Sequence, residues 1–195
     1  MGNRARVLDR WYGRNNRRSG WRAPKTPRGA FTGVPQYKFE DLFISPLTHK
    51  RSADADGNII YVPIEPARNM TPTGIKVMDS YLQHLARGEA DVADFCKQYN
   101  ARTSDIDGMV FLLTGMSNQA FRAKWQIQTA DLLLRYTDMG VTEVARRSGM
   151  GTRTNMYFIY ERELDTSPTE RRNALRQKGD VGRFAVRAPL PASPS

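Results

Sequence analysis

The sequence predicts an all-α fold that contains two successive helix-turn-helix units, with a basic arm and a small β-hairpin before them. Three observations support this prediction. Apolar residues recur at helical spacing through most of residues 71–172. Two segments, 90–115 and 126–172, share the plan of a helix, a turn and a second helix. Most of the positive charge lies outside these segments, near the two ends of the chain.

Residues 1–35 form the predicted arm, which is rich in arginine and aromatic residues. Residues 1–38 contain ten Lys or Arg and one acid, and Trp11, Tyr12 and Trp21 are interleaved with the arginines. This composition is typical of an arm that orders on a nucleic acid, with arginine on phosphate and aromatic rings available for stacking. The alternative is a disordered, solvated tail without a fixed partner. The residues predicted to contact DNA, or alternatively RNA, are Arg4, Arg6, Arg10, Arg14, Arg17, Arg18, Arg22, Lys25 and Arg28.

A small β-hairpin is predicted within residues 36–70. An apolar stretch, Phe39 to Ile44, is followed by a polar connection, 45–58, and then by a β-branched run, 59–66. The apolar stretch and the β-branched run are therefore the two candidate strands, with the polar connection between them.

A turn dipeptide and a proline define this hairpin further. Asp56-Gly57 is typical of tight turns, and Pro63 limits the second strand to the edge of a sheet. The acidic residues around the turn resemble part of a calcium loop, but Ile59 occupies the position that requires glycine. We therefore expect a turn here and no metal site.

A helix is predicted from about residue 73 to a break at Gly88. Its inner face consists of Ile75, Met78, Tyr81, Leu82 and Leu85. The first helix-turn-helix unit then lies within residues 90–115. The first of its two helices has an apolar face of Val92, Phe95, Cys96 and Tyr99, and the second has a face of Ile106, Met109, Val110 and Leu113.

The clearest pattern lies between Gln126 and Arg172. A first helix carries the apolar stripe Ile127, Ala130, Leu133 and Leu134, and a short second helix carries Val141, Val144 and Ala145. The chain must turn sharply at Gly149, after which Thr152 or Thr154 can cap a further helix. The inner face of that helix is Met156, Ile159 and Tyr160. In such an arrangement the last helix can enter a DNA major groove.

A set of short motifs in this region has a specific order and spacing. The motifs are Ala130-Leu133-Leu134, Val141-Glu143-Val144-Ala145, Gly149-Met150, Thr154-Met156 and Ser167-Pro168-Glu170-Arg172. They resemble the DNA-binding half of the arabinose-regulator (AraC/XylS) family of bacterial transcription regulators. Thr114-Gly115, Ser117 and Phe121 match the joint between the two units of that family. The resemblance covers about residues 75–172 and implies a DNA-binding bundle of two three-helix units joined by a linker helix.

Several residues depart from the family pattern. Gln126 stands where the family usually has arginine, Met150 replaces the usual aromatic residue, and Phe158 stands where arginine is frequent. The first unit is acidic, and Asp105 and Asp107 lie at the start of its second helix, where carboxylates would face phosphate unfavourably. We therefore expect the first unit to be a packing surface or the surface for a protein partner, and the second unit to bind DNA.

The residues predicted to contact DNA lie around the second turn and the last helices. Arginine can pair with guanine, and asparagine with adenine, through two hydrogen bonds each. The predicted base contacts are Thr152, Arg153, Asn155 and Tyr157. The predicted phosphate contacts are Arg146, Arg147, Arg171, Arg172 and Arg176. The alternative for each arginine is a solvated charge on an exposed helix face.

Little in the sequence suggests catalysis, a cofactor or a membrane anchor. The chain has one cysteine and two histidines, and neither His49 nor His84 has another ligand residue at metal-binding spacing. Cys96 lies on an inner helical face and is expected in the core. No apolar run approaches the length that spans a bilayer. We expect a cytoplasmic, nucleoid-associated protein that is not an enzyme and that binds neither a metal nor a cofactor.

Two functions are compatible with these features. The first is a bacterial transcription regulator of the AraC type that binds double-stranded DNA, mainly through the second unit, and lacks an effector-binding domain. The alternative is a structural nucleic-acid-associated protein of a nucleoid, phage particle or ribonucleoprotein, which binds phosphate through basic ends and protein through an acidic core. The charge distribution favours this alternative, because residues 1–38 carry a net +9, residues 171–195 a net +5 and the remainder a net −4. The predicted boundaries are 1–35 for the arm, 36–70 for the hairpin, 71–172 for the DNA-binding domain and 173–195 for a basic Pro/Ala/Ser tail.

Overall fold

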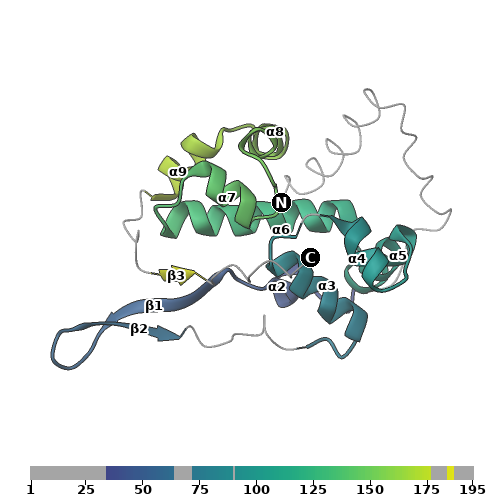
Figure 1. Cartoon of the computed structure of the whole chain (residues 1–195), viewed down its shortest axis with the longest axis horizontal. Helices are drawn as coiled ribbons and strands as arrows, with labels where there is room; N and C mark the ends of the chain where they lie inside the picture. Colours follow the sequence, from purple (N-terminus) through teal and green to yellow (C-terminus); the bar gives the residue numbers. More distant parts are fainter. Residues whose placement is uncertain (1–33, 64–71, 90, 177–183, 187–195) are drawn as a thin grey trace. The chain divides into compact units, whose positions relative to one another are not determined.

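The described part of the chain is mainly helical, with a small antiparallel sheet, as the sequence predicts. The computed structural model describes residues 34–63, 72–89, 91–176 and 184–186 (Figure 1). The predicted contact residues of the arm, from Arg4 to Arg28, lie outside these residues. The chain divides into one unit of Met1–Val34 and another of Pro35–Ser195. The elements described within Pro35–Ser195 are α2 (Phe39–Leu42), β1 (Leu47–Ala53), β2 (Ile59–Pro63), α3 (Lys76–Ala86), α4 (Val92–Gln98), α5 (Thr103–Thr114), α6 (Asn118–Tyr136), α7 (Val141–Arg147), α8 (Arg153–Leu164), α9 (Pro168–Arg176) and β3 (Phe184–Val186).

The described strands form one sheet in the order β2-β1-β3, with both pairs antiparallel. The turn between β1 and β2 contains Gly57 at φ +84°, and the Asp54 carboxylate accepts the backbone N–H groups of Asp56 and Asn58 at 3.0 and 2.8 Å. The predicted turn and the edge position of β2, which ends at Pro63, are therefore confirmed. Strand β3 adds a third strand from within the segment 173–195, which was expected to be only a basic tail.

The first predicted strand is wrong, because residues 39–42 form the helix α2. Phe39 and Leu42 are both buried, and Phe43 packs edge-on against Trp125 with ring centroids 4.9 Å apart. The real first strand, β1, lies in the stretch that was interpreted as a polar connection. Its last four residues are exposed, so burial imposes no apolar alternation on them and the usual strand signal is missing.

Helix α6 is the linker helix that the resemblance implied, and it contributes to two separate hydrophobic cores (Figure 1). Phe121 and Trp125, in its first half, are buried with α2, α3, α4 and α5. Ala130, Leu133 and Leu134, in its second half, are buried with α7 and α8. The predicted inner face of α8 is confirmed, since Met156, Ile159 and Tyr160 are all buried. In α7, Val144 and Ala145 are buried and Val141 is partly buried against the same core. Each helix-turn-helix unit therefore has its own core.

The turns inside the two units have the same hydrogen-bond pattern. After α7, Gly149 is left-handed at φ +76°, and the N–H of Met150 donates to the Ala145 carbonyl at 2.9 Å. After α4, Asn100 is left-handed at φ +48°, and the N–H of Ala101 donates to the Cys96 carbonyl at 2.9 Å. Both are Schellman motifs, in which a left-handed residue lets the chain leave the helix and satisfy its last carbonyl groups.

The sequence pattern identified the turn residue Gly149 but not its counterpart in the first unit. Asn100 gives a weaker signal than glycine, because asparagine is common in loops of every kind, although it tolerates the left-handed region better than most residues. Tyr99, which was predicted on the apolar face of α4, is the residue that ends this helix and is 40% exposed. It stacks on Phe95 with ring centroids 4.6 Å apart.

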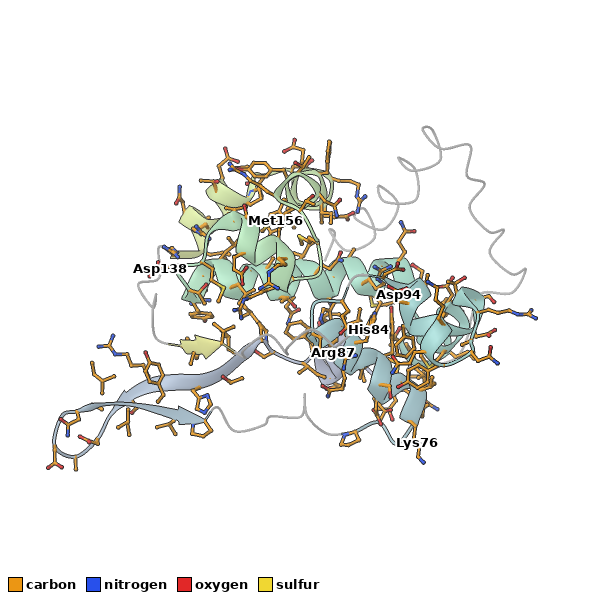
Figure 2. All side chains as sticks on the ribbon, viewed as in Figure 1. Lys76, His84, Arg87, Asp94, Asp138 and Met156 are labelled. Atoms are coloured by element: carbon orange, nitrogen blue, oxygen red, sulfur yellow. The ribbon has the colours of Figure 1, made fainter. Side chains whose placement is uncertain are left out.

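Taken as three-helix units, α3–α5 and α7–α9 touch through the turn that follows α3, near His84 and Arg87, which are marked in Figure 2. A Cβ atom at Gly88 would lie 2.7 Å from the carbonyl oxygen of Arg147, at the end of α7. The Gln126 side chain on α6 also donates to the Gly149 carbonyl at 2.7 Å. Gly88 is at φ +78°, so both its conformation and the close backbone approach favour glycine at this position.

Candidate nucleic-acid interface

Helix α8 begins with a well-formed cap and has one buried face and one exposed face. The Thr152 hydroxyl accepts the N–H of Asn155 at 3.2 Å, which confirms Thr152 as the cap in preference to Thr154. Met156, for example, is fully buried and faces the second core, and it is marked in Figure 2. We define the α8 face as the opposite side of the first two turns, which consists of Arg153, Thr154, Asn155, Tyr157 and Phe158.

Arg153 and Tyr157 are successive residues of one row on the α8 face. The guanidinium carbon of Arg153 lies 5.5 Å from the centre of the Tyr157 ring, within the range of a cation–π contact. The Tyr157 hydroxyl lies 3.2 Å from the hydroxyl of Thr169 on α9. The bond to Thr169, and secondarily the contact with Arg153, lower the pKa of Tyr157. Because α9 holds the tyrosine ring, the ring in turn restricts the positions of the arginine.

Asn155 is tied to the turn by only part of its amide. Its Nδ2 group donates one hydrogen bond to the Met150 carbonyl at 2.7 Å. An asparagine amide has a second N–H and a carbonyl oxygen. Those two groups are the pair that recognises the N7 and N6 atoms of adenine, so the bond to Met150 orients the amide without consuming the atoms needed for base recognition.

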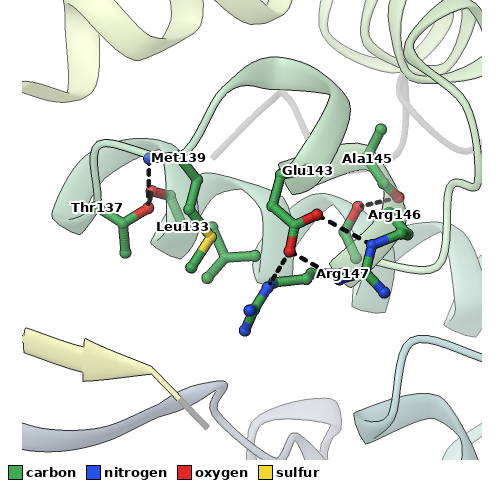
Figure 3. Close-up of polar contacts among 8 residues, drawn as sticks. Leu133, Thr137, Met139, Glu143, Ala145, Arg146 and Arg147 are labelled. Atoms are coloured by element: carbon green, nitrogen blue, oxygen red, sulfur yellow. Dashed lines mark hydrogen bonds and ion pairs between the residues drawn. The ribbon is translucent and has the colours of Figure 1, made fainter. Parts of the chain in front are cut away.

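Arg146 and Arg147, at the end of α7, share the carboxylate of Glu143 (Figure 3). Arg146 donates to it at 3.0 and 2.7 Å, and Arg147 donates at 2.5 Å. The bonds from Arg146, followed by those from Arg147, lower the pKa of Glu143 to about 2. The Arg146 side chain is 57% exposed and that of Arg147 is 21% exposed. Exposed ion pairs contribute only about 0–1 kcal/mol, so Arg146 can exchange Glu143 for a phosphate at small cost.

The three arginines of α9 have intramolecular partners on α6 and just beyond it. Arg171 holds Asp131 through two nitrogens at 3.0 and 2.5 Å, and the same carboxylate accepts the Tyr160 hydroxyl at 2.9 Å. Arg172 donates to the Met139 carbonyl. Burial is the main cause that lowers the pKa of Arg172.

Arg176 completes this set of α9 arginines. It donates to the Leu134 carbonyl at 3.0 Å and to the Thr137 carbonyl, and it lies 3.0 Å from the Asp138 carboxylate, which is marked in Figure 2. The last carbonyl groups of a helix lack helical partners, and a cation there also complements the helix dipole. Arg171, Arg172 and Arg176 therefore hold α9 against the end of α6. Their contact with phosphate stays a prediction, and sequence spacing did not suggest this second role.

In the first unit, part of the acidic charge serves as helix caps. The Asp91 side chain accepts the N–H of Ala93 at 2.7 Å at the start of α4, and the Asp105 side chain accepts the N–H of Arg102 at 2.9 Å at the start of α5. Carboxylates at helix N-termini satisfy free N–H groups and complement the dipole. The outer side of α5 beyond Asp105 presents Gly108 and Leu112, which line a shallow apolar hollow.

Phe158 is a surface residue that the predicted site left out. Its side chain is 69% exposed on the α8 face, although phenylalanine is usually buried. The signal was present in the sequence, because Phe158 falls between the inward positions Met156 and Ile159 and so cannot share their face. An apolar side chain on such a helix can contact the methyl group of thymine.

Two further observations concern metals and membranes. Among the described residues, no three His, Cys, Asp or Glu side chains gather in a way that could hold a metal ion. His84 is instead buried, with its ring nitrogens 2.5 Å from Glu89 and 3.1 Å from the Asp91 carbonyl. Cys96 is buried, as predicted.

None of the helices in the described ranges has the length and apolar character needed to cross a bilayer.

Comparison with known proteins gave matches only among solved structures; no family model and no curated protein matches the chain. The chain is similar to the DNA-binding domain of AdpA, a global transcriptional factor, in complex with a target DNA, with 26% identity, a TM-score of 0.46, and coverage of 53% of this chain and 93% of that one. It is similar to the C-terminal domain of AraT, a response regulator from Geobacillus stearothermophilus, with 18% identity, a TM-score of 0.44, and coverage of 51% and 82%. The xylose-binding transcription activator XylR matches with 18% identity, a TM-score of 0.41, and coverage of 63% of this chain and 34% of its own.

Proposed function

We propose that this protein is a DNA-binding transcription regulator that inserts α8 into the major groove. The observation that carries the proposal is the α8 face, a capped and exposed helix start with base-reading groups whose positions are restricted. The guanidinium of Arg153 lies over the Tyr157 ring, and Asn155 keeps one N–H and its carbonyl oxygen available. Arg153 would read guanine through its O6 and N7 atoms, and Asn155 would read adenine. Thr152 lies at the entry to this helix.

Phosphate contacts would flank this reading helix. Arg146 precedes the turn, is more than half exposed, and has only an exposed carboxylate as its partner. We propose that it binds the phosphate backbone together with Arg147 and with the N–H groups at the start of α8. Phe158 would contact a thymine methyl group further into the groove. The arginines of the arm would add phosphate or minor-groove contacts.

The test is a selection of bound sequences from a random duplex library at physiological salt. Wild type should enrich a defined motif, and the double variant Arg153→Ala, Asn155→Ala should lose the preference at two or more positions. Each lost base contact should reduce discrimination by about 1–3 kcal/mol. Arg162→Ala is the matched control, because Arg162 is an exposed arginine near the other end of α8. Binding without enrichment, unchanged by the double variant, would contradict the proposal.

The second candidate is a structural nucleic-acid-associated protein, and the segregation of charge favours it. Residues 1–38 carry a net +9, whereas the part between residues 39 and 170 carries a net −4. Removal of residues 1–33, which belong to the separate compact unit Met1–Val34, distinguishes the two functions. A regulator should keep its preferred site with weaker affinity. A protein that binds through its basic ends should lose nearly all affinity.

A further inference from the structure

Strand β2 is an edge strand with exposed apolar side chains on both of its faces. Ile59, Ile60, Tyr61 and Val62 are 59%, 39%, 52% and 44% exposed. Within the described residues, β1 pairs with one edge of β2 and no strand pairs with the other. Natural proteins usually protect such an edge with charged side chains, yet residues 59–63 contain none.

The register of the hairpin shows which backbone groups face the free edge. The N–H of Asp54 donates to the Asn58 carbonyl at 3.0 Å, so the pairs beyond it alternate between bonded and non-bonded. Ser52–Ile60 is then a bonded pair, and the N–H and C=O groups of Ile60 point toward β1. Those of Ile59 and Tyr61 point outward, to the free edge. Pro63 also faces outward but has no N–H.

We propose that this edge pairs antiparallel with the β2 strand of a second copy of the chain, with the two-fold axis at Ile60. Ile59 of each copy then lies opposite Tyr61 of the other, and every outward N–H and C=O group of these two residues is bonded. Centring the axis on Tyr61 would instead set the Pro63 ring opposite Ile59, whose carbonyl would lack a donor. The proline therefore selects one register.

The side chains fit the same register. Successive side chains of a strand lie on opposite faces, so Ile60 lies on one face and Ile59 and Tyr61 lie on the other. At the axis, Ile60 of one copy would pack against Ile60 of the other in a non-bonded pair, where side chains approach most closely. On the other face each Tyr61 would pack against Ile59, an aromatic and β-branched pair of the kind that stabilises sheets.

A second copy fits this edge better than a nucleic acid. The hairpin carries Asp54 and Asp56 at its turn and Lys50 and Arg51 on β1, so residues 47–63 have no net positive charge to attract the phosphate groups of DNA or RNA. An uncharged edge raises no like-charge repulsion between two copies, and a two-fold axis requires only one edge that complements itself. Pairing of two short strands buries less than the roughly 800 Å² per partner of a stable interface. The dimer should therefore be reversible and dependent on concentration.

The experiment is sedimentation equilibrium of the full chain without DNA, over a range of protein concentrations. Wild type should dimerise reversibly, and Ile60→Lys, which places two positive charges at the axis, should raise the dissociation constant at least tenfold. Mixing the Ile60→Lys chain with an Ile60→Glu chain should restore association, because opposite charges then meet. Leu112→Lys, at another exposed apolar residue, should behave as wild type. Wild type that stays monomeric, or an Ile60→Lys chain that dimerises as wild type does, would overturn the proposal.

A cross-linking experiment tests the register. With oxidised glutathione as oxidant, the Ile60→Cys chain should form a covalent dimer, because the two residues lie directly opposite each other. Lys50→Cys, on β1, should not. Cys96 is buried and serves as the internal control in wild type. Cross-linking through residue 50 but not residue 60 would overturn the proposed pairing. Association of the chain through β2 does not require bound DNA.

Discussion

The two helix-turn-helix units end their first helix in the same way but present different outer surfaces. In both, a left-handed residue follows the first helix and closes a Schellman motif, with Asn100 in one unit and Gly149 in the other. The first unit reaches its next helix with one residue fewer, since the cap is Arg102 in one case and Thr152 in the other. The backbone of either unit therefore leads from a left-handed residue into a second helix.

The two units differ in the residues on their outer surfaces. Helix α5 presents Asp105 and Asp107 near its start and Leu112 further along, whereas α8 presents Arg153 and Asn155 at its start. Carboxylates repel phosphate, while arginine and asparagine can bind bases. The two units therefore share the helix that follows a left-handed turn and differ in the side chains that this helix exposes.

The largest expected effect concerns the contact that joins the two units. Gly88→Ala would place a Cβ atom 2.7 Å from the Arg147 carbonyl oxygen, in addition to the strain of a left-handed alanine. We expect the free energy of unfolding to fall by about 3 kcal/mol, since a non-glycine residue in this region costs about 1–3 kcal/mol and the clash adds to it. Urea denaturation measures the change.

Gly74→Ala is the matched control for this variant. Gly74 is also left-handed, at φ +80°, but a Cβ atom there would meet no atom within 4 Å. It should cost only about 1 kcal/mol, the strain alone. Equal losses at both positions would mean that the two units do not approach each other closely at Gly88.

Arg171 and Arg153 provide the next test. Arg171 bonds Asp131 on α6, whereas Arg153 is exposed on the α8 face. Arg171→Ala should lower the free energy of unfolding by about 1–2 kcal/mol, since Asp131 would lose two charge-assisted bonds in a largely buried setting. Arg153→Ala should change it by less than about 0.5 kcal/mol, as is usual for an exposed residue. Thermal unfolding of both variants gives the comparison, and a larger loss from Arg153→Ala would reverse the two roles.

A smaller effect concerns the charge next to the α8 face. Glu143→Gln would remove the carboxylate that Arg146 and Arg147 share, so both arginines could bind phosphate without a competing anion. DNA affinity should rise a few-fold, and the slope of log affinity against log salt should steepen by about 1.

The gain in DNA affinity from Glu143→Gln should not depend on pH between 6 and 8. Because the pKa of Glu143 is lowered to about 2, the carboxylate stays charged at neutral pH. The gain from Glu143→Gln should therefore be equal at pH 6 and pH 8, as measured by fluorescence anisotropy. A gain that disappears at pH 6 would show that Glu143 is already neutral there.

The helices could be predicted from the sequence wherever one face is buried. Met156, Ile159 and Tyr160 lie inward as their spacing indicates, because burial of one face creates that spacing. Strand β1 could not be predicted, because solvent reaches most of its residues and leaves no apolar alternation. The partner of Arg171 could not be predicted either, since Asp131 lies 40 residues away along the chain.

The smallest expected effect concerns the left-handed residues Asn100 and Gly149, which end the first helix of each unit. Asn100→Gly would give the first turn the same left-handed residue type as the second, and glycine has no steric penalty at φ +48°. We expect a gain in the free energy of unfolding of about 0.5 kcal/mol, reduced by the greater freedom of glycine in the unfolded chain. The reciprocal change, Gly149→Asn, should cost more than this, because a Cβ atom at residue 149 would lie 3.3 Å from the Gly88 carbonyl oxygen. Chemical denaturation of the two variants measures the asymmetry. Equal and opposite changes would show that the two left-handed positions differ only in residue type, whereas the expected inequality would show that Gly149 also takes part in the contact between the units.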